Sequence, residues 1–103
     1  MLIPHAVGEA IREICSNREW AYDDHIEMCW GVANATSRLG LPGRTISCLS
    51  EREFRESFKR GGETEELVEA VICGLELRGL ISELPEGAQI PEEEYKLYEI
   101  AGV

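Results

Sequence analysis

The chain has 103 residues, of which 44% are hydrophobic, and its 20 acidic residues outnumber 10 basic ones to give a net charge of −10. This length is typical of a single domain, and the hydrophobic content is sufficient for a buried core. The charge works against non-specific attraction to nucleic acid or anionic lipid, because both require net positive charge where contact is made.

The N-terminal residues and the cysteines indicate the cellular compartment of the protein. Residues 1–5 contain no basic cluster, and no apolar run typical of a secretory signal follows them. No run of about 18 apolar residues occurs, so no transmembrane helix is expected. The four cysteines, Cys15, Cys29, Cys48 and Cys73, form no C-x-x-C pair. We expect reduced thiols and a cytoplasmic protein.

Residues 4–16 are predicted to form the first helix. Pro4 suits the first helical position, where its missing N–H costs nothing. Apolar residues recur at helical spacing and define one buried face: Ile3, Val7, Ala10, Ile11 and Ile14. Residues 17–22 are predicted to be a connector.

A second helix is predicted from Asp24 to Leu39. Asp24 and Glu27 have the spacing of a capping box, and the sequence from Leu39 to Pro42 is typical of a helix stop, with Gly40 in the left-handed conformation. Because almost no charge interrupts the segment between these caps, we expect a central helix that is buried most of the way round.

A short strand and a third helix follow. Residues 44–48 are β-branched and flanked by Pro-Gly, which predicts a brief strand. Ser50 and Glu53 form a full S-x-x-E capping box, with Leu49 and Phe54 at the hydrophobic-staple positions. This helix is predicted to end at Gly61-Gly62.

The C-terminal part is predicted to be a helix followed by a hairpin. Residues 64–78 carry a buried stripe at helical spacing, and Gly79 closes the helix. Residues 80–84 and 95–100 are predicted strands, joined by a long acidic loop over residues 85–94. In the last strand, Tyr95 and Tyr98 should point to opposite faces. Either one packs on the core while the other shields the sheet edge, or one is an exposed interface residue.

Residues 67–81, which end in an L-x-x-R-G-L-I pattern, resemble the third helix and wing of the winged helix-turn-helix superfamily. The resemblance covers about residues 24–100, with residues 1–22 as an added helix and connector in the same single domain. It implies an α+β fold with four helices, a short strand and a C-terminal two-stranded wing. In that superfamily the helix after the turn commonly lies in the DNA major groove.

The charges of this chain depart from that pattern. Residues 63–103 contain 11 acidic residues against Arg78 and Lys96. The start of the would-be reading helix and the wing tip are both rich in glutamate, where a phosphate-binding surface needs lysine and arginine. Direct DNA binding through this helix and wing is therefore not expected.

One basic ridge allows a different interpretation. Arg52, Arg55 and Lys59 lie at helical spacing, with Arg44 and Arg60 nearby. Interleaved with them, in salt-bridging spacings, are Glu51, Glu53 and Glu56. The ridge is either a salt-bridged, solvated face or an off-centre contact with nucleic acid or an acidic protein.

Motifs for catalysis are missing from the sequence. No P-loop, dinucleotide fingerprint or nucleophile elbow occurs. His25 and Cys29 have i,i+4 spacing but lack two further zinc ligands, and a cysteine on an apolar helix is usually a core residue, as is Cys73. The glutamates of the acidic loop do not have EF-hand spacing. We expect no enzyme activity, no metal and no cofactor.

These features predict a non-catalytic, acidic protein-binding module. Its predicted contact residues are Glu65, Glu66, Glu69, Glu92, Glu93 and Glu94, with Tyr95 as an anchor. Carboxylates can occupy arginine and lysine sites built for phosphates, and in size and charge the chain resembles small acidic phage proteins such as the anti-CRISPR inhibitors. The expected partner is thus a protein with a basic, nucleic-acid-binding surface. We expect this chain to bind it as a monomer or homodimer.

Two alternatives stay open at the level of sequence. The first is a dimeric winged-helix DNA-binding regulator that uses the basic ridge: Arg44, Arg52, Arg55, Lys59 and Arg60. The second is a structural subunit of a larger assembly, in which the wing pairs its edge strand with a partner.

Overall fold

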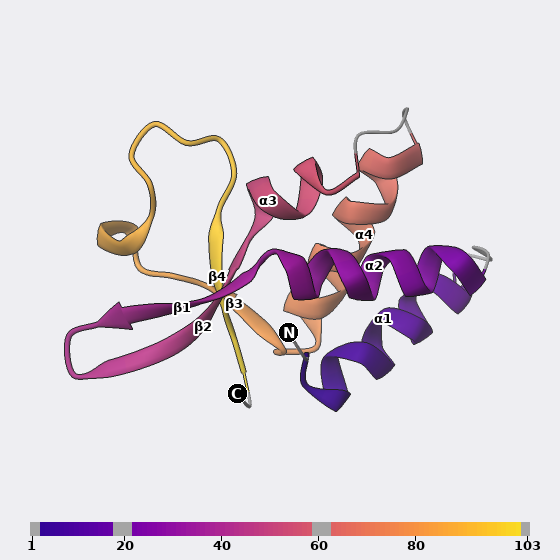
Figure 1. Ribbon diagram of the computed structural model, residues 1–103, viewed down its shortest axis with the longest axis horizontal. Helices are drawn as coiled ribbons and strands as arrows, with labels where there is room; N and C mark the ends of the chain where they lie inside the picture. The colour runs from indigo at the N-terminus through magenta and orange to yellow at the C-terminus, as the bar shows by residue number, and fades with distance from the viewer. Residues whose placement is uncertain (1–2, 18–21, 59–62, 102–103) are drawn as a thin grey trace.

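The computed structural model describes residues 3–17, 22–58 and 63–101 (Figure 1). Over these ranges the chain forms four α-helices and four strands in a small α+β domain. The elements in chain order are α1 (His5–Asn17), α2 (Tyr22–Asn34), β1 (Thr36–Leu41), β2 (Arg44–Ser50), α3 (Glu51–Glu56), α4 (Glu63–Leu77), β3 (Ile81–Glu83), the 3-10 turn η1 (Glu86–Ala88) and β4 (Leu97–Ile100). The four predicted helices are confirmed, but the sequence predicted three strands.

The strands form one antiparallel sheet in the order β1-β2-β4-β3. The predicted pair β3–β4 is present, and β4 also pairs with β2, where Cys48 lies opposite Glu99. Figure 1 shows the helices gathered at one end of the molecule and the β1–β2 hairpin extending from the other. The loop between β3 and β4 arches over the same side of the hairpin as α3 (Figure 1).

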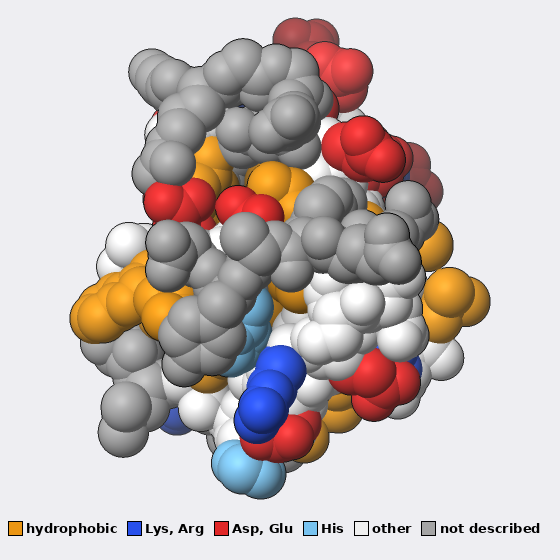
Figure 2. Space-filling view, turned by 90° about the vertical axis from the view of Figure 1, so that its right-hand side faces the viewer, with side chains coloured by type: hydrophobic (Ala, Val, Ile, Leu, Met, Phe, Trp, Pro, Cys, Tyr) orange, Lys and Arg blue, Asp and Glu red, His pale blue; other side chains and the backbone are white. Residues whose placement is uncertain are grey.

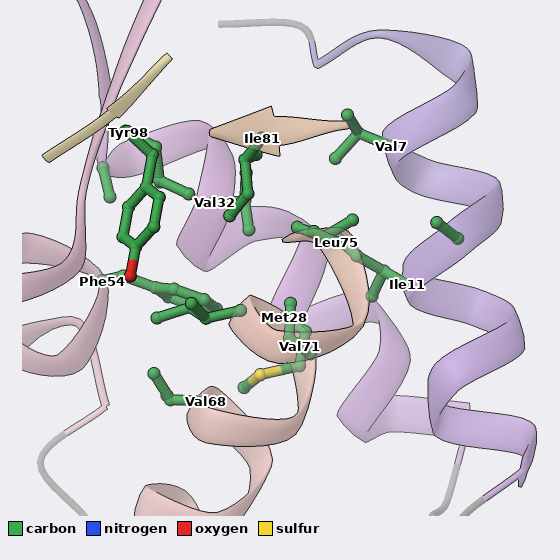
Figure 3. Close-up of a cluster of buried hydrophobic side chains, with 14 of the residues drawn as sticks. Val7, Ile11, Met28, Val32, Phe54, Val68, Val71, Leu75, Ile81 and Tyr98 are labelled. Atoms are coloured by element: carbon green, nitrogen blue, oxygen red, sulfur yellow. The ribbon is translucent and has the colours of Figure 1, made fainter. Parts of the chain in front are cut away.

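The main core lies between the helices and one face of the sheet (Figure 3). The fully buried stripe of α4 forms its centre, and α1, α2, α3 and the sheet each contribute side chains. Its members include Ile11, Met28, Phe54, Val68, Val71, Leu75, Ile81 and Tyr98. Burial of each such side chain contributes roughly 1.5–3 kcal/mol to the free energy of folding before entropy is counted.

The local signals that end α4 and begin α3 are confirmed. Gly79 has φ +71, and the Leu80 N–H donates to the Leu75 carbonyl, which is the Schellman arrangement. At α3, the Ser50 hydroxyl accepts from the Glu53 N–H at 3.2 Å, and the staple residue Phe54 is fully buried.

The predicted second helix was wrong at both ends. α2 begins at Tyr22, so Asp24 is not its N-cap, and it ends at Asn34 rather than Leu39. Residues 36–41 form β1, and Pro42-Gly43, with Gly43 at φ +80, make the hairpin turn. Leu39 faces Ile46 across the hairpin and packs into a second apolar cluster, so a cross-strand contact decides the conformation.

α2 is also less buried than predicted. Trp30 is 64% exposed and Ile26 lies on the same helical face, also exposed. The opposite face of the helix packs closely, because Gly31 lies against the rings of Phe54 and Phe58. The apolar residues of this helix therefore belong only in part to the core.

The third helix ends earlier than predicted. α3 stops at Glu56, and the predicted stop at Gly61-Gly62 lies outside the described residues. The Ser57 hydroxyl donates to the Glu53 carbonyl at 2.9 Å. Phe58 then turns into the core, where its ring meets that of Phe54 edge-on at 5.9 Å. Burial of this second ring fixes where the chain leaves the helix.

The loop between β3 and β4 covers the second apolar cluster. This cluster consists of Ile46, Cys48 and Leu84, on the sheet face away from the main core. The Gln89 amide holds the loop: its Nε2 donates to the carbonyls of Leu84 and Leu97, and its Oε1 accepts from the Leu97 N–H at 2.8 Å. The Gln89 side chain thus supplies hydrogen bonds to Leu84 and Leu97 of the kind that a neighbouring strand provides within a sheet.

Within the described part of the chain, no helix has both the length and the apolar character needed to cross a bilayer.

Candidate functional site

Helix α3 brings the two predicted acidic segments together. It lies between α4, which carries Glu65 and Glu69, and the loop that carries Glu93 and Tyr95 (Figure 1). Arginines of α3 reach to both sides. We call the resulting surface the α3 acidic face, defined by Glu51, Arg52, Arg55, Glu56, Glu65, Glu66, Glu69, Glu92, Glu93, Glu94 and Tyr95.

Arg55 is the centre of this face. Its Nε donates to Glu51 Oε2 at 2.8 Å, one terminal nitrogen bonds Glu65, and the other lies 3.4 Å from Glu69. The Tyr95 ring stacks on the guanidinium, with 4.9 Å from Cζ to the ring centroid. The Arg55 side chain is only 11% exposed. One guanidinium therefore joins α3, α4 and the loop.

The protonation of Arg55 follows from these partners. Burial works to lower its pKa, but the hydrogen bond that Arg55 donates to Glu51 and the charges of Glu51 and Glu65 outweigh burial and raise the pKa. Arg55 thus stays cationic, and its charge is directed at carboxylates of the same molecule.

Arg52 forms the second connection between α3 and the loop. It bonds Glu93 at 2.6 Å and lies 3.5 Å from Glu56, one helical turn away. Partial burial works to raise the Glu93 pKa, but the hydrogen bond from Arg52, with help from the backbone N–H of Tyr95, lowers it overall. Glu93 is therefore ionised and held in place at neutral pH.

The predicted basic ridge is consequently salt-bridged. Arg52 and Arg55 make the i,i+4 pairs that the spacing suggested, and Arg44 bonds Glu99 at 3.0 Å. Lys59 and Arg60 lie outside the described residues. Every described arginine of the ridge thus contacts a carboxylate, and Arg52 and Arg55 each contact more than one.

The carboxylates around these arginines remain accessible. Glu65 and Glu69 are 67% and 75% exposed at the side chain despite contacting Arg55, and Glu66, Glu92 and Glu94 are exposed as well. The eight glutamates of the face against Arg52, Arg55 and the adjacent Lys96 give these described residues a net charge of −5. Figure 2, which looks onto the helical end, shows acidic side chains gathered toward its upper part.

The two tyrosines of the C-terminal segment have separate environments. Tyr98 is buried in the core on β4, where burial first, and then the charges of Glu51, Glu76 and Glu83, raise the pKa of its hydroxyl. Tyr95 precedes β4 and is half-buried against Arg55. Tyr98 thus packs on the core, as one of the two interpretations predicted. Tyr95 contacts Arg55 and is also partly exposed to solvent.

Cys73, which the sequence predicted to be a core residue, is exposed, so that prediction was wrong. The other three cysteines offer little nucleophilic chemistry. Burial, with smaller contributions from Asp24 and Cys29, raises the pKa of Cys15 to about 11. Burial also raises the pKa of Cys29 and of Cys48. A nucleophilic or metal-binding thiol requires the opposite shift. Among the described residues, no three His, Cys, Asp or Glu side chains gather as a metal site would need.

Sequence reasoning missed two features. It treated the basic ridge and the acidic residues as rival sites, whereas Arg52 and Arg55 hold the acidic residues in one face. It also missed the exposure of Trp30. The i,i+4 spacings pointed to the pairs within α3, but the contacts to α4 and the loop depend on packing.

No family model matches this chain, and no curated protein or solved structure is significantly similar to it. Its function is therefore inferred from its own geometry.

Proposed function

We propose that this chain is a non-catalytic, acidic protein-binding module that occupies a basic, nucleic-acid-binding surface of a partner. The observation that carries the proposal is the pairing of Arg52 and Arg55 with surplus carboxylates, which leaves the α3 acidic face strongly negative although two arginines lie at its centre. A partner surface built for phosphates would find oxygen acceptors there instead.

The face is suited to this role by its rigidity. Arg55 holds Glu65 and Glu69 near the loop, and Arg52 holds Glu93, so these carboxylates are oriented before a partner arrives. Carboxylates accept bidentate hydrogen bonds from arginine as phosphates do. Pre-organisation lowers the entropy cost of binding, and the net charge steers association with a basic partner.

A winged-helix arrangement is part of the same proposal. α3, α4 and the β3–β4 hairpin follow one another as the two helices and wing of that superfamily do, and the β1–β2 hairpin is added on the far side of β4. The helix that would read DNA carries Glu65, Glu66 and Glu69 in its first turns. In this interpretation the wing and reading helix present carboxylates to a protein.

The dimeric DNA-binding regulator is the weaker interpretation. Its basic ridge would need arginines that are available to phosphates, but Arg44, Arg52 and Arg55 are each engaged by glutamates. Breaking these contacts to bind DNA would leave the surrounding carboxylates facing phosphates, which costs free energy.

The test is affinity capture with charge-reversed variants. Tagged wild-type protein, Glu66→Lys, Glu94→Lys and the control Glu9→Lys are each incubated with cell lysate, one half nuclease-treated and the other half untreated, and washed at increasing salt. Glu66, Glu94 and Glu9 are all exposed, and Glu9 lies on α1, away from the α3 acidic face. Each reversal changes the net charge equally, so a difference reports on position.

We expect wild type and Glu9→Lys to retain the same nucleic-acid-binding protein and release it at high salt, while Glu66→Lys and Glu94→Lys release it at lower salt. Equal retention by all four proteins would remove this face from consideration. Retention of nucleic acid, lost on nuclease treatment, would support the basic ridge instead.

A further inference from the structure

A cavity of about 550 Å³ lies under the loop between β3 and β4. This volume falls in the range of roughly 300–1,000 Å³ that holds small ligands. Glu83 and Leu84 line it from the start of the loop, and Tyr95 and Lys96 from the end. The Gln89 amide ties these two ends together through Leu84 and Leu97, so the walls of the cavity are held by hydrogen bonds.

The lining combines an apolar surface with carboxylates. Ile90 and Pro91 contribute apolar wall, and Ile90 is 51% exposed. Four glutamates also line the cavity: Glu83, Glu86, Glu92 and Glu93. A ligand that matches both parts needs an apolar stem and a cationic head.

Among the described residues, the charges that line the cavity are only partly balanced. Arg52 bonds Glu93, which leaves Glu83, Glu86 and Glu92 against Lys96, a net charge of −2. Tyr95 also lines the cavity, and its ring already contacts the guanidinium of Arg55 at 4.9 Å, which is the kind of contact that a guanidinium in the cavity could make.

We propose that this cavity accepts an arginine side chain from the protein partner. The aliphatic stem covers Ile90 and Pro91, while the guanidinium meets Glu86 and Glu92 beside the Tyr95 ring. Arginine fits better than lysine, because its planar head stacks on an aromatic ring and bonds two carboxylate oxygens at once. This inference rests on the proposed function and adds an anchoring contact to it.

The test is an amide-resolved NMR titration of the full chain with N-acetyl-L-argininamide. The matched probe is N-acetyl-L-citrullinamide, which has nearly the same shape and no charge. We expect the arginine probe to shift only the amide signals of residues 83–96, and the citrulline probe to leave them unshifted. Glu86→Gln with Glu92→Gln should weaken its binding by about threefold or more. Glu9→Gln with Glu53→Gln, an equal change in charge on exposed residues outside the cavity, should leave it unchanged.

Three results would overturn the inference: equal shifts with the citrulline probe, shifts confined to α3 and α4, or unchanged affinity in the Glu86→Gln, Glu92→Gln variant. The spectrum of that variant without probe shows that it is folded. Partner capture that depends on Glu66, without probe binding in the cavity, would leave the proposed function standing and refute the anchor. Probe binding in the cavity without Glu66-dependent capture would leave the cavity as an arginine site and refute the proposed function.

Discussion

At the scale of single residues, Arg55 shows how one side chain can join three parts of the chain. Its contacts to Glu51, Glu65, Glu69 and Tyr95 use both the donors and the flat face of the guanidinium. Lysine has a point charge and no plane to stack, so it cannot reproduce this set. The contribution of Arg55 should therefore depend on geometry as well as charge.

We predict that Arg55→Lys lowers the free energy of unfolding by about 1–2 kcal/mol, because charge-assisted hydrogen bonds and the ring contact are lost together. Urea denaturation followed by circular dichroism measures the change. Arg12→Lys is the control, since Arg12 is exposed on α1, and should change stability by less than about 0.5 kcal/mol. Equal effects of the two substitutions would mean that Arg55 acts through charge alone.

The pair of Arg52 and Glu93 should give stability a defined dependence on pH. Because the folded-state pKa of Glu93 is lowered from the model-peptide value of 4.5, its contribution is present above that pH and is lost as pH falls through the folded pKa. Glu93→Gln should therefore destabilise the protein at pH 7, and the difference from wild type should shrink toward pH 3. Denaturation midpoints across this range measure it.

The partner substitution supplies the control for that pH dependence. In an Arg52→Ala background the effect of Glu93→Gln should lose most of its dependence on pH, because the principal hydrogen bond to Glu93 is already gone. A pH profile of the Glu93→Gln effect that is unchanged by Arg52→Ala would assign the lowered pKa to the backbone contacts.

At the scale of elements, close packing and hydrogen bonding set where segments lie. α2 approaches α3 closely because residue 31 has no side chain, and the loop between β3 and β4 keeps its course through Gln89. The first contact joins residues far apart in sequence, whereas Gln89 bonds residues five and eight positions away. Each of the two contacts can be tested by a single substitution.

We predict that Gly31→Ala destabilises the protein by about 1–3 kcal/mol, because the new methyl would overlap the Phe58 ring and lie 2.8 Å from Phe54 Cε1. Gly8→Ala is the matched control in α1, where the nearest atom to the new methyl is Ile3 Cδ1 at 3.8 Å. It should stabilise the helix by about 0.5–1 kcal/mol through helix propensity. Thermal melts of both variants check the opposite signs, and two changes of the same sign would contradict the packing of α2.

The loop gives the second test at this scale. Gln89→Ala removes three hydrogen bonds that join the two ends of the loop and should cost about 1–3 kcal/mol. The Leu97 amide should then exchange its hydrogen faster than in wild type. Gln89→Glu keeps the acceptor for the Leu97 N–H but loses both donated hydrogen bonds. The Leu97 amide should therefore stay protected from exchange, while the loop is still destabilised. Unchanged exchange in Gln89→Ala would show that other contacts hold the loop.

At the scale of the whole molecule, sequence predicted what local signals determine. The stripes of α1 and α4, the Ser50 cap and the Gly79 stop all follow from residues within one or two turns. The conformation of Leu39 does not, because burial against Ile46 and the loop makes its segment a strand. The candidate acidic residues were identified from charge, but their union through Arg55 depends on Glu65, ten residues away, and on Tyr95 in a distant loop.

A competition experiment tests whether the α3 acidic face occupies a nucleic-acid-binding surface. The captured partner is loaded with a fluorescently labelled oligonucleotide, and the protein is added while anisotropy is measured at two salt concentrations. We predict release of the oligonucleotide, with less release at higher salt and with Glu66→Lys, but not with Glu9→Lys. An oligonucleotide that stays bound to the partner, or that binds this protein directly, would contradict it.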